Sequence, residues 1–292
     1  MKRKRVDSVQ ISNEDYRQFK PLMFSIAYRM LGSVADAEDI VQETFLKAYQ
    51  MNEQKIDNKR AYLCKIVTNR CLDELKSARH RREQYTGPWN PVPLLLENTD
   101  PSYMLLQKEG LSIAFLRMME HLAPDERAVL LLREVFDFSY SEISAIIGKK
   151  EENCRKILSR AKQKTSRIED ESLNYEDNKS IVNHFIQAFQ TQNTDALIHL
   201  ISENVTLYSD GGGIVKAAVR PIVSRTNVLA LLYGITKIVP EDYNIMIKNV
   251  NNQPAIVIYM NGKIHSIMSF YIYNAKINEI YMTMNPDKLP AV

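Results

Sequence analysis

The run from Leu116 to Arg167 constrains the fold of this 292-residue chain most, because its apolar spacing and its breaker residues predict short helices joined by turns. One helix should follow Ser139, whose hydroxyl can accept from the backbone N–H of Glu142 while the Glu142 carboxylate reaches back, and should end at Gly148. The next helix has an apolar stripe of Cys154, Ile157, Leu158 and Ala161. Its outward face carries Arg155, Lys156, Ser159 and Arg160. Such a face suits phosphates and base edges, so the pattern predicts a helix-turn-helix reader of duplex DNA, with a solvated helical hairpin as the alternative.

A second basic helix is predicted over Ala61–Arg82, AYLCKIVTNRCLDELKSARHRR. Its apolar face carries Cys64, Val67, Cys71 and Leu75. On the opposite face, Asn69 and Asp73 offer donor and acceptor groups one turn apart, and a surface hydrogen-bonding pair is their alternative reading. Lys76 and Arg79, near the end of this helix, can hold backbone phosphates.

A third helix, Arg29–Tyr49, has the sequence RMLGSVADAEDIVQETFLKAY and an acidic outer edge. Its inward stripe is Ala37, Val41, Thr44 and Ala48. Its outward stripe includes Asp36, Asp39 and Glu43, which we call the acidic ridge. Most such stripes are only solvated. Because DNA would be repelled from it, an acidic ridge in a basic part of the chain favours a protein partner.

Taken in their order along the chain and with their spacing, the three segments resemble the extracytoplasmic-function sigma factors of bacterial RNA polymerase. The resemblance covers most of the chain before Glu171. It implies that Arg29–Tyr49 binds core polymerase through Asp36, Asp39 and Glu43. It implies that Ala61–Arg82 captures the minus-ten element through Asn69, Asp73, Lys76 and Arg79. It further implies that Leu122–Arg160 reads the minus-thirty-five duplex through Arg155, Lys156, Ser159 and Arg160.

The same resemblance implies a function and its partners. The partners are core RNA polymerase, contacted at the β′ clamp and the β flap, and promoter DNA. The implied function is promoter-directed transcription initiation, which is not an enzymatic activity of the sigma factor and requires no cofactor.

Composition agrees with a multi-domain protein of the cytoplasm. A chain with 45% hydrophobic and 25% charged residues is long enough for two or three cores. The excess of Lys and Arg lies before Glu171, and MKRKR at the start has no apolar run behind it, so we expect neither a secretory signal nor a membrane span. Three cysteines, an odd number, argue against a disulfide framework, and the scattered histidines predict no metal site.

The segment EQYTGPWNPVPLLLENTD, residues 83–100, cannot continue a helix because it contains several prolines and Gly87. Trp89, the only tryptophan, lies in GPWNPVP, where an aromatic ring typically anchors an extended segment. Here the chain resembles the sigma-factor subgroup with a SnoaL-like C-terminal domain, whose linkers carry a WLPEP pattern. Trp89, Pro91 and Pro93 match that pattern. Asn90 and Val92 depart from it, so the role of the missing acidic residue does not carry over.

Beyond Glu171 the pattern changes to helices followed by strands. Helices are predicted around Ile181–Phe189, Leu197–Ile201 and Asn227–Tyr233, and a first strand over Val205–Tyr208. Antiparallel strands with Asn or Gly turns are predicted at Tyr243–Val250, Ala255–Met260, Ile264–Tyr273 and Lys276–Met284. This order predicts an α+β cone of the nuclear-transport-factor-2 type.

Two segments of this domain resemble signatures of the SnoaL-like subgroup. They are DGGGIVKAAVR at Asp210–Arg220, with Ile214 where a lysine is more usual, and NPDKL near the end of the chain. The predicted regulatory contacts are Trp89, Pro91, Pro93, Asp210, Gly211, Gly212, Gly213, Asn285, Pro286, Asp287, Lys288 and Leu289. The segment Asn285–Leu289, which we call the tail, has no evident reason to be ordered unless it docks on the rest of the chain, and fraying in solvent is the alternative.

The expected fold class is therefore two all-α sigma domains, the second a helix-turn-helix, followed by an α+β cone. The predicted boundaries are 1–82 and 111–167 for the sigma domains, 83–110 and 168–176 for the linkers, and 177–292 for the cone. We expect the cone to regulate the sigma domains in cis, with a small ligand in the cone as a further partner.

Two alternatives remain open. The chain could be a ligand-binding helix-turn-helix regulator that never contacts polymerase. The cone could instead be catalytic, with Tyr208, Asp210, His265 and Tyr281 lining its cavity, although Asp210 before three glycines more readily makes a tight turn.

Overall fold

The computed structural model describes residues 11–50, 58–83, 85–96, 111–165, 174–236 and 243–290, without the side chains of 78–83 and 236. The side chain of Arg79 and parts of both predicted linkers therefore lie outside the described residues. The chain forms two compact units. The first comprises residues 1–79, 100–105 and 119–166, and the second comprises 80–99, 106–118 and 167–292.

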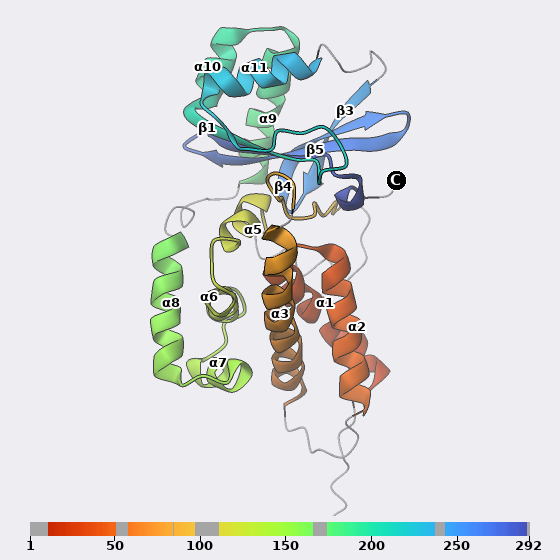
Figure 1. Ribbon diagram of the computed structural model, residues 1–292, viewed down its shortest axis with the longest axis vertical. Helices are drawn as coiled ribbons and strands as arrows, with labels where there is room; N and C mark the ends of the chain where they lie inside the picture. Colours follow the sequence, from red (N-terminus) through yellow and green to blue (C-terminus); the bar gives the residue numbers. More distant parts are fainter. Residues whose placement is uncertain are drawn as a thin grey trace, which may run out of the picture. The chain divides into compact units, whose positions relative to one another are not determined.

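Three long helices form the N-terminal part of the first unit: α1 (Asn13–Leu31), α2 (Val34–Gln50) and α3 (Lys59–Glu83) (Figure 1). Ser12 caps α1 and shares a reciprocal capping box with Asp15. The prediction of one helix over Arg29–Tyr49 is wrong at its start. Gly32 adopts a left-handed conformation with φ 67°, which ends α1 and lets α2 begin at Val34.

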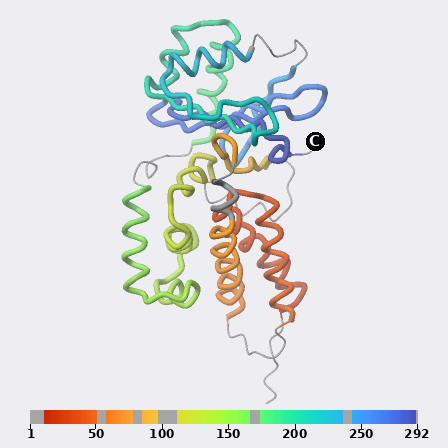
Figure 2. The backbone as a smooth tube through the Cα atoms, in the orientation of Figure 1, coloured from red at the N-terminus to blue at the C-terminus, as the bar shows by residue number. Residues whose placement is uncertain are grey.

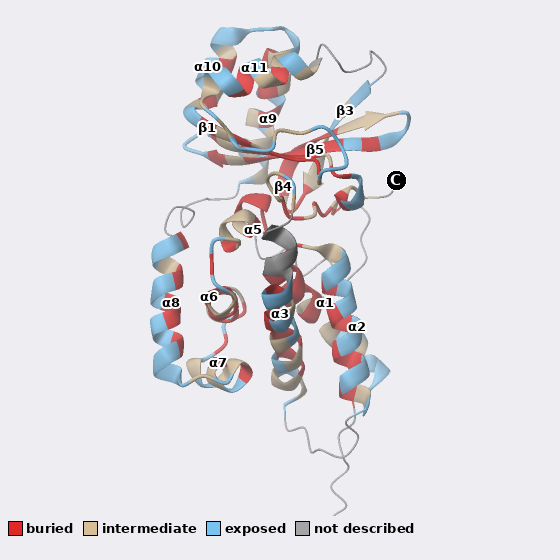
Figure 3. Ribbon diagram, in the orientation of Figure 1, coloured by how far each residue is buried: buried red, intermediate tan, exposed pale blue. Residues whose placement is uncertain are grey.

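The helix-turn-helix lies in the second half of the first unit. It consists of α6 (Pro124–Leu130), a π-helical turn over Leu131–Val135, α7 (Tyr140–Ile147) and α8 (Glu151–Thr165). The predicted capping box between Ser139 and Glu142 is present, and Gly148 ends α7 with φ 69°. Figure 3 shows the buried residues of α8 as a stripe, and they include the predicted Cys154, Ile157, Leu158 and Ala161.

In the second unit, the segment that precedes the helix-turn-helix helices contributes α5 (Ile113–Met119). The C-terminal domain adds α9 (Tyr175–Gln190), α10 (Thr194–Leu200) and α11 (Arg225–Thr236). Its strands are β1 (Ile201–Asp210), β2 (Ile222–Val223), β3 (Tyr243–Val250), β4 (Gln253–Met260), β5 (Lys263–Tyr273) and β6 (Lys276–Thr283). A single turn of 3-10 helix, η3, follows at Pro286–Lys288.

The six strands form one sheet in the order β2-β1-β6-β5-β4-β3, and β3 to β6 are an antiparallel meander. Figure 2 follows the chain through this domain by colour, from green at α9 to dark blue at β6. β1 and β6 pair in parallel, which the sequence did not predict. The predicted helix at Leu197–Ile201 and strand at Val205–Tyr208 have wrong boundaries, because Ile201 already starts β1. The helices α9, α10 and α11 cover one face of the sheet in Figure 1, and the predicted fold class is confirmed.

Each face of this sheet has its own core. Val182, Phe185 and Leu197 of the helices pack on Phe270 and Ile280 of one face. On the other face, a smaller core of Val250, Val257 and Ile267 is covered by Leu95 of the linker and Leu289 of the tail. The linker and the tail therefore occupy the face that the helices leave uncovered.

Candidate functional site

The outward face of α8 is the predicted reader of duplex DNA. Arg155, Lys156, Ser159 and Arg160 are all exposed. The Lys156 Nζ lies 2.6 Å from Glu152 Oε1, and the guanidinium carbon of Arg155 lies 3.9 Å from the centre of the Tyr140 ring. Exposed contacts of this kind contribute little free energy, so Lys156 and Arg155 can exchange them for contacts with DNA phosphates at little cost in free energy.

Asn69 of α3 is predicted to capture bases of the minus-ten element. It is half-buried, and its Nδ2 donates to the backbone oxygens of Lys65 at 2.9 Å and of Ile146 at 3.0 Å. The Ile146 oxygen belongs to the last turn of α7, so one predicted DNA-reading residue bonds to the helix-turn-helix. Asp73 and Lys76 are exposed and form an ion pair of 3.3 Å.

Arginines that the sequence-based prediction overlooked add further contacts between the two parts of the first unit. The Arg60 guanidinium lies 4.4 Å from the centre of the Phe138 ring and donates to the Phe136 oxygen. Arg127 is buried and donates to the Met30 oxygen at the end of α1. Burial lowers the pKa of Arg127 to about 10. The bond to the Ile146 oxygen occupies the Asn69 amide group that is predicted to capture bases.

The acidic ridge lies on α2 as predicted. Asp36, Asp39 and Glu43 are exposed, while the inward stripe of Ala37, Val41, Thr44 and Ala48 is buried. Glu43 lies 3.2 Å from the exposed Arg70 of α3. The other two carboxylates have no ion pair among the contacts described for this part of the chain.

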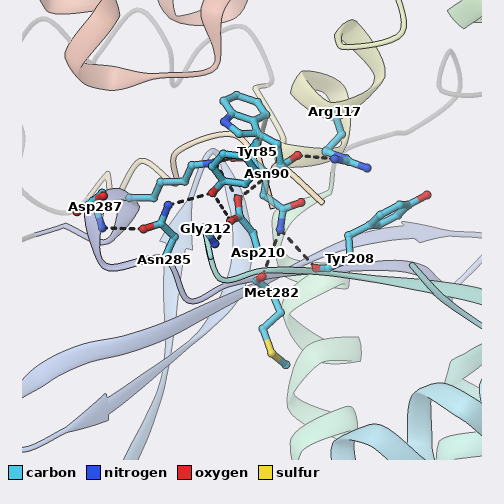
Figure 4. A network of polar contacts seen from close by, with 11 residues as sticks. Tyr85, Asn90, Arg117, Tyr208, Asp210, Gly212, Met282, Asn285 and Asp287 are labelled. Carbon is cyan, nitrogen blue, oxygen red and sulfur yellow. Dashed lines mark hydrogen bonds and ion pairs between the residues drawn. The ribbon is translucent and has the colours of Figure 1, made fainter. Parts of the chain in front are cut away.

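In the second unit, the Asp210 carboxylate is fully buried at the end of β1 and accepts four hydrogen bonds (Figure 4). Its Oδ1 accepts from the Tyr85 hydroxyl and from the Gly212 N–H at 3.2 Å. Its Oδ2 accepts from the Asn90 N–H at 2.7 Å and from the Lys288 Nζ at 2.8 Å. These four donors satisfy the acceptor capacity of a carboxylate.

The tail contributes Asn285 and Lys288 to the same cluster. Lys288 is only 7% exposed, and its Nζ also donates to the Asn90 oxygen at 2.7 Å and lies 4.1 Å from the centre of the Trp89 ring. The Asn285 Nδ2 donates to the Tyr85 hydroxyl at 2.9 Å. We call this cluster of Tyr85, Trp89, Asn90, Asp210, Asn285 and Lys288 the linker clasp.

Burial, followed by the hydrogen bond to Asp210, raises the pKa of Tyr85 well above its ordinary value. The hydroxyl therefore remains a donor to the carboxylate throughout the physiological range. The Gly211–Gly213 turn fits closely around the cluster. A Cβ at Gly212, where φ is 62°, would overlap the Asn285 amide, and one at Gly213 would come within 3.2 Å of the Thr86 hydroxyl oxygen.

The remaining predicted regulatory residues lie on the linker and on the tail. Pro91 and Pro93 are buried beside the clasp residues of the linker. Pro286 and Asp287 are exposed, and the Asp287 N–H donates to Asn285 Oδ1 at 3.0 Å. Leu289 packs on the smaller core of the sheet.

Asn90, Tyr85 and Arg117 belong to this region, and none of them was among the predicted site residues. Asn90 is fully buried, and its Nδ2 donates to the Met282 oxygen at 3.3 Å. Arg117 of α5 donates to the Trp89 oxygen, and its guanidinium lies 4.3 Å from the centre of the Tyr208 ring. Asn90 stood out in the sequence only as a departure from WLPEP, which was the available signal.

The catalytic alternative required Tyr208, Asp210, His265 and Tyr281 to line one cavity. The domain has a cavity between the sheet and α9 and α11, but of these four only His265 lines it. Tyr208 stacks on Tyr281 at 5.7 Å, and Asp210 is part of the clasp. Neighbouring residues on a strand point to opposite faces of the sheet, so Met282 faces the cavity while Tyr281 and its partner Tyr208 face the other side.

Comparisons with known proteins agree with this arrangement. Residues 15–81 match the family Sigma-70 region 2, and residues 112–165 match Sigma-70, region 4. The ECF RNA polymerase sigma factor SigJ of Mycobacterium tuberculosis is 31% identical over 227 residues, which cover 76% of this chain and 72% of that protein. The chain belongs to the extracytoplasmic-function sigma-70 factors.

A second sigma factor of this family, the probable ECF RNA polymerase sigma factor SigI of Mycobacterium tuberculosis, is 29% identical over 280 residues. That match covers 94% of this chain and 93% of the relative. The crystal structure of SigJ is similar with a TM-score of 0.77 at 25% identity, over 95% of this chain and 98% of that one. The C-terminal domain is therefore part of the shared architecture. No helix among the described residues could cross a membrane.

Proposed function

We propose that this chain binds core RNA polymerase and directs it to specific promoters. The observation that carries the proposal is the presence of both Sigma-70 regions in one chain, the first with an exposed acidic ridge on α2 and the second with an exposed basic face on α8. The basic face suits duplex DNA and the acidic ridge suits a protein. Such a factor acts in the cytoplasm.

The residue roles in this proposal are those that the family resemblance implies. Asp36, Asp39 and Glu43 bind core polymerase at the β′ clamp, and the helix-turn-helix part also meets the β flap. Asn69, Asp73, Lys76 and Arg79 hold the opened minus-ten strand. Arg155, Lys156, Ser159 and Arg160 read the minus-thirty-five duplex.

Reversing two charges of the acidic ridge tests the assignment to polymerase. Asp39→Lys/Glu43→Lys should weaken capture of purified core RNA polymerase about tenfold or more. Circular dichroism should show unchanged helix content, because both side chains are exposed. The matched control is the same double reversal at exposed acids of the C-terminal domain, Glu176 and Glu203. If the unmodified chain captures no core polymerase, the proposal fails in favour of a ligand-binding DNA regulator.

We further propose that the linker clasp regulates the sigma regions in cis. The linker joins the two promoter-reading regions, and the clasp fixes Asn90 of that linker to Asp210 and Lys288. A tethered domain experiences a high effective concentration, so even a weak contact can restrain the linker. Restraint of the linker limits how far apart the two promoter-reading regions can lie.

Two truncations test the cis regulation in a purified transcription assay. Deletion of residues 285–292 removes the tail donors but retains the domain, whereas truncation after Asp170 removes the whole domain. We expect transcription from a cognate promoter to change in both, and to differ between them. Equal transcription from all three proteins at equal concentration would contradict the proposal.

The C-terminal domain acts in this scheme without catalysis. Asp210, the carboxylate of this cluster and therefore its candidate general base, already accepts four hydrogen bonds, one of them from its ion-pair partner Lys288. A base needs a free lone pair directed at its substrate. A satisfied buried carboxylate instead serves as the centre of an intramolecular contact.

A further inference from the structure

The C-terminal domain contains a cavity of about 290 Å³ on the helix-covered face of its sheet. It is lined mainly by apolar side chains of α9, α11 and strands β3 to β6. Its size is close to the lower end of the range for small-molecule sites. The linker clasp is held by residues at the ends of β1 and β6, so the cavity is a second feature of the same domain.

One wall of this cavity is a ladder of aromatic rings. Tyr233 of α11 stacks on Phe189 of α9 with ring centres 5.0 Å apart, and Phe189 stacks on Phe185 at 6.0 Å. The opposite wall is rich in methionine, namely Met260, Met268, Met282 and Met284. Ring faces favour a flat partner, and thioethers are polarisable and adapt their shape to it.

The polar groups of the lining are few, and a β-bulge supplies one of them. Ile258 pairs with Ser266, but the next residue, Tyr259, pairs with Ile264, so His265 is an extra residue in β5. A bulge re-aims side chains, and both His265 and the buried Ser266 line the cavity. Among the described residues that line it there is no Asp, Glu, Lys or Arg. Apart from the imidazole of His265, the described lining offers no side chain that could compensate the charge of an ionised ligand, so the chemistry favours a neutral molecule.

The end of β6 connects the cavity with the linker clasp. The side chains of Met282 and Met284 line the cavity, and in Figure 4 the Met282 side chain points away from Asn90. The backbones of the same two residues hold the clasp. The backbone oxygen of Met282 accepts from Asn90 Nδ2 at 3.3 Å, and the Met284 N–H donates to the backbone oxygen of Asp210 at 2.8 Å.

We propose that this cavity is a receptor site for a neutral, flat, mainly apolar small molecule with one hydrogen-bonding group, and that its occupancy is transmitted through the end of β6 to the linker clasp. The transmission step rests on the proposed cis regulation, whereas the binding step does not. A ligand that packs against Met282 and Met284 fixes the strand segment whose backbone holds Asn90. Its binding therefore favours one state of the clasp over the other.

A neutral fluorescent probe, N-phenyl-1-naphthylamine, tests the binding step on the full chain. Titration should show saturable binding at one site per chain. Ile245→Trp places a large ring in the cavity and should weaken binding about tenfold or more. The matched control, Met246→Trp, changes the next residue of β3, which is 42% exposed, and should bind within about twofold of the unmodified chain. Equal affinity of Ile245→Trp and the unmodified chain, with both folded by thermal melting, would overturn the site.

The transmission step is tested by reciprocity, because a ligand that shifts the clasp must bind differently when the clasp is broken. Asn90→Ala removes the hydrogen bond to the Met282 oxygen and should weaken probe binding about fivefold. Thr86→Ala, an exposed linker substitution, is the control. Unchanged probe affinity in Asn90→Ala overturns the transmission. Transcription by Asn90→Ala without probe is measured separately. If it equals that of the unmodified chain, the cis regulation fails while the receptor site stands.

Discussion

The Nζ of Lys288 lies 2.8 Å from the Oδ2 of Asp210, 78 residues earlier in the chain, and both side chains are almost completely buried. A buried ion pair is costly to break, because removal of one partner leaves the other charge without compensation. Lys288→Met should therefore lower the free energy of unfolding of the C-terminal domain by about 3 to 5 kcal/mol. Denaturant unfolding followed by the fluorescence of Trp89, the only tryptophan, measures this loss.

Two further variants sharpen this prediction. Asp210→Asn/Lys288→Met removes both charges and should be less destabilised than Lys288→Met alone. Lys276→Met, at an exposed lysine of β6, should stay within about 0.5 kcal/mol of the unmodified chain. Equal losses in Lys288→Met and Lys276→Met would mean that the ion pair does not stabilise the clasp.

Alanine substitutions at Gly212 and Gly262 distinguish the cost of backbone strain from the cost of steric overlap. Both glycines have a positive φ, 62° and 73°. A Cβ at Gly262 meets no atom within 4 Å, whereas one at Gly212 overlaps Asn285. Gly262→Ala should cost about 1 to 2 kcal/mol from the left-handed conformation alone. Gly212→Ala should cost about 1 to 3 kcal/mol more and displace the tail. Denaturant unfolding and Trp89 fluorescence compare the two, and equal costs would contradict the close fit of the tail.

Glu126 predicts a pH dependence of the helix-turn-helix. Its carboxylate accepts from Lys164 Nζ at 2.7 Å and from the Ala123 N–H at 2.9 Å. Burial alone would raise the pKa of Glu126, but these hydrogen bonds hold it below the ordinary 4.5. The stabilisation is therefore present above pH 4.5 and is lost as the pH falls through the lower pKa of the folded state.

Glu126→Gln should lower the free energy of unfolding by about 1 to 2 kcal/mol at neutral pH, since Lys164 is half exposed and the pair is partly screened. In acid the difference from the unmodified chain should disappear. Glu152→Gln, at a carboxylate whose side chain is 78% exposed, should have almost no effect at either pH. Circular dichroism in denaturant measures all three proteins, and a difference that persists in acid would exclude the carboxylate as its source.

The basic face of α8 predicts a salt dependence of promoter binding. Lys156→Ala or Arg160→Ala should weaken binding to duplex promoter DNA and lower the slope of log affinity against log salt by about one for each phosphate that is no longer neutralised. Lys162→Ala lies on the same helix, but its Nζ lies 2.7 Å from Glu134, and it should leave the slope unchanged. Fluorescence anisotropy across a salt series gives the slopes. An unchanged slope in Lys156→Ala and Arg160→Ala would remove both from the DNA interface.

Local chemistry made the helical parts predictable. The capping box of Ser139 and Glu142 and the end of α7 at Gly148 depend on residues three to nine positions apart, so the sequence alone determines them. The same kind of signal was overlooked at Gly32, which interrupts the predicted helix Arg29–Tyr49. The meander of β3 to β6 was predictable as well, because its strands are joined by short Asn and Gly turns.

Long-range pairing was not predictable in this way. Nothing in the residues of β1 indicates that its parallel partner is β6, and that pairing decides which residues meet Asp210. Asn90 has no helix or strand period to mark it, so its contact with Asp210 could not be derived from spacing. The family resemblance assigned Asn69 to DNA, but its bond to the Ile146 oxygen depends on how two distant segments pack.

The parallel pairing of β1 with β6 has a consequence for the order of synthesis. β1 has only the two-residue β2 on its other side, so the sheet cannot close before Thr283 has been made. The sigma regions are complete once Thr165 has been added. At typical rates of translation, roughly ten seconds separate the two events. Each newly made chain therefore passes through a period in which its promoter-reading regions can fold and the linker clasp cannot yet form.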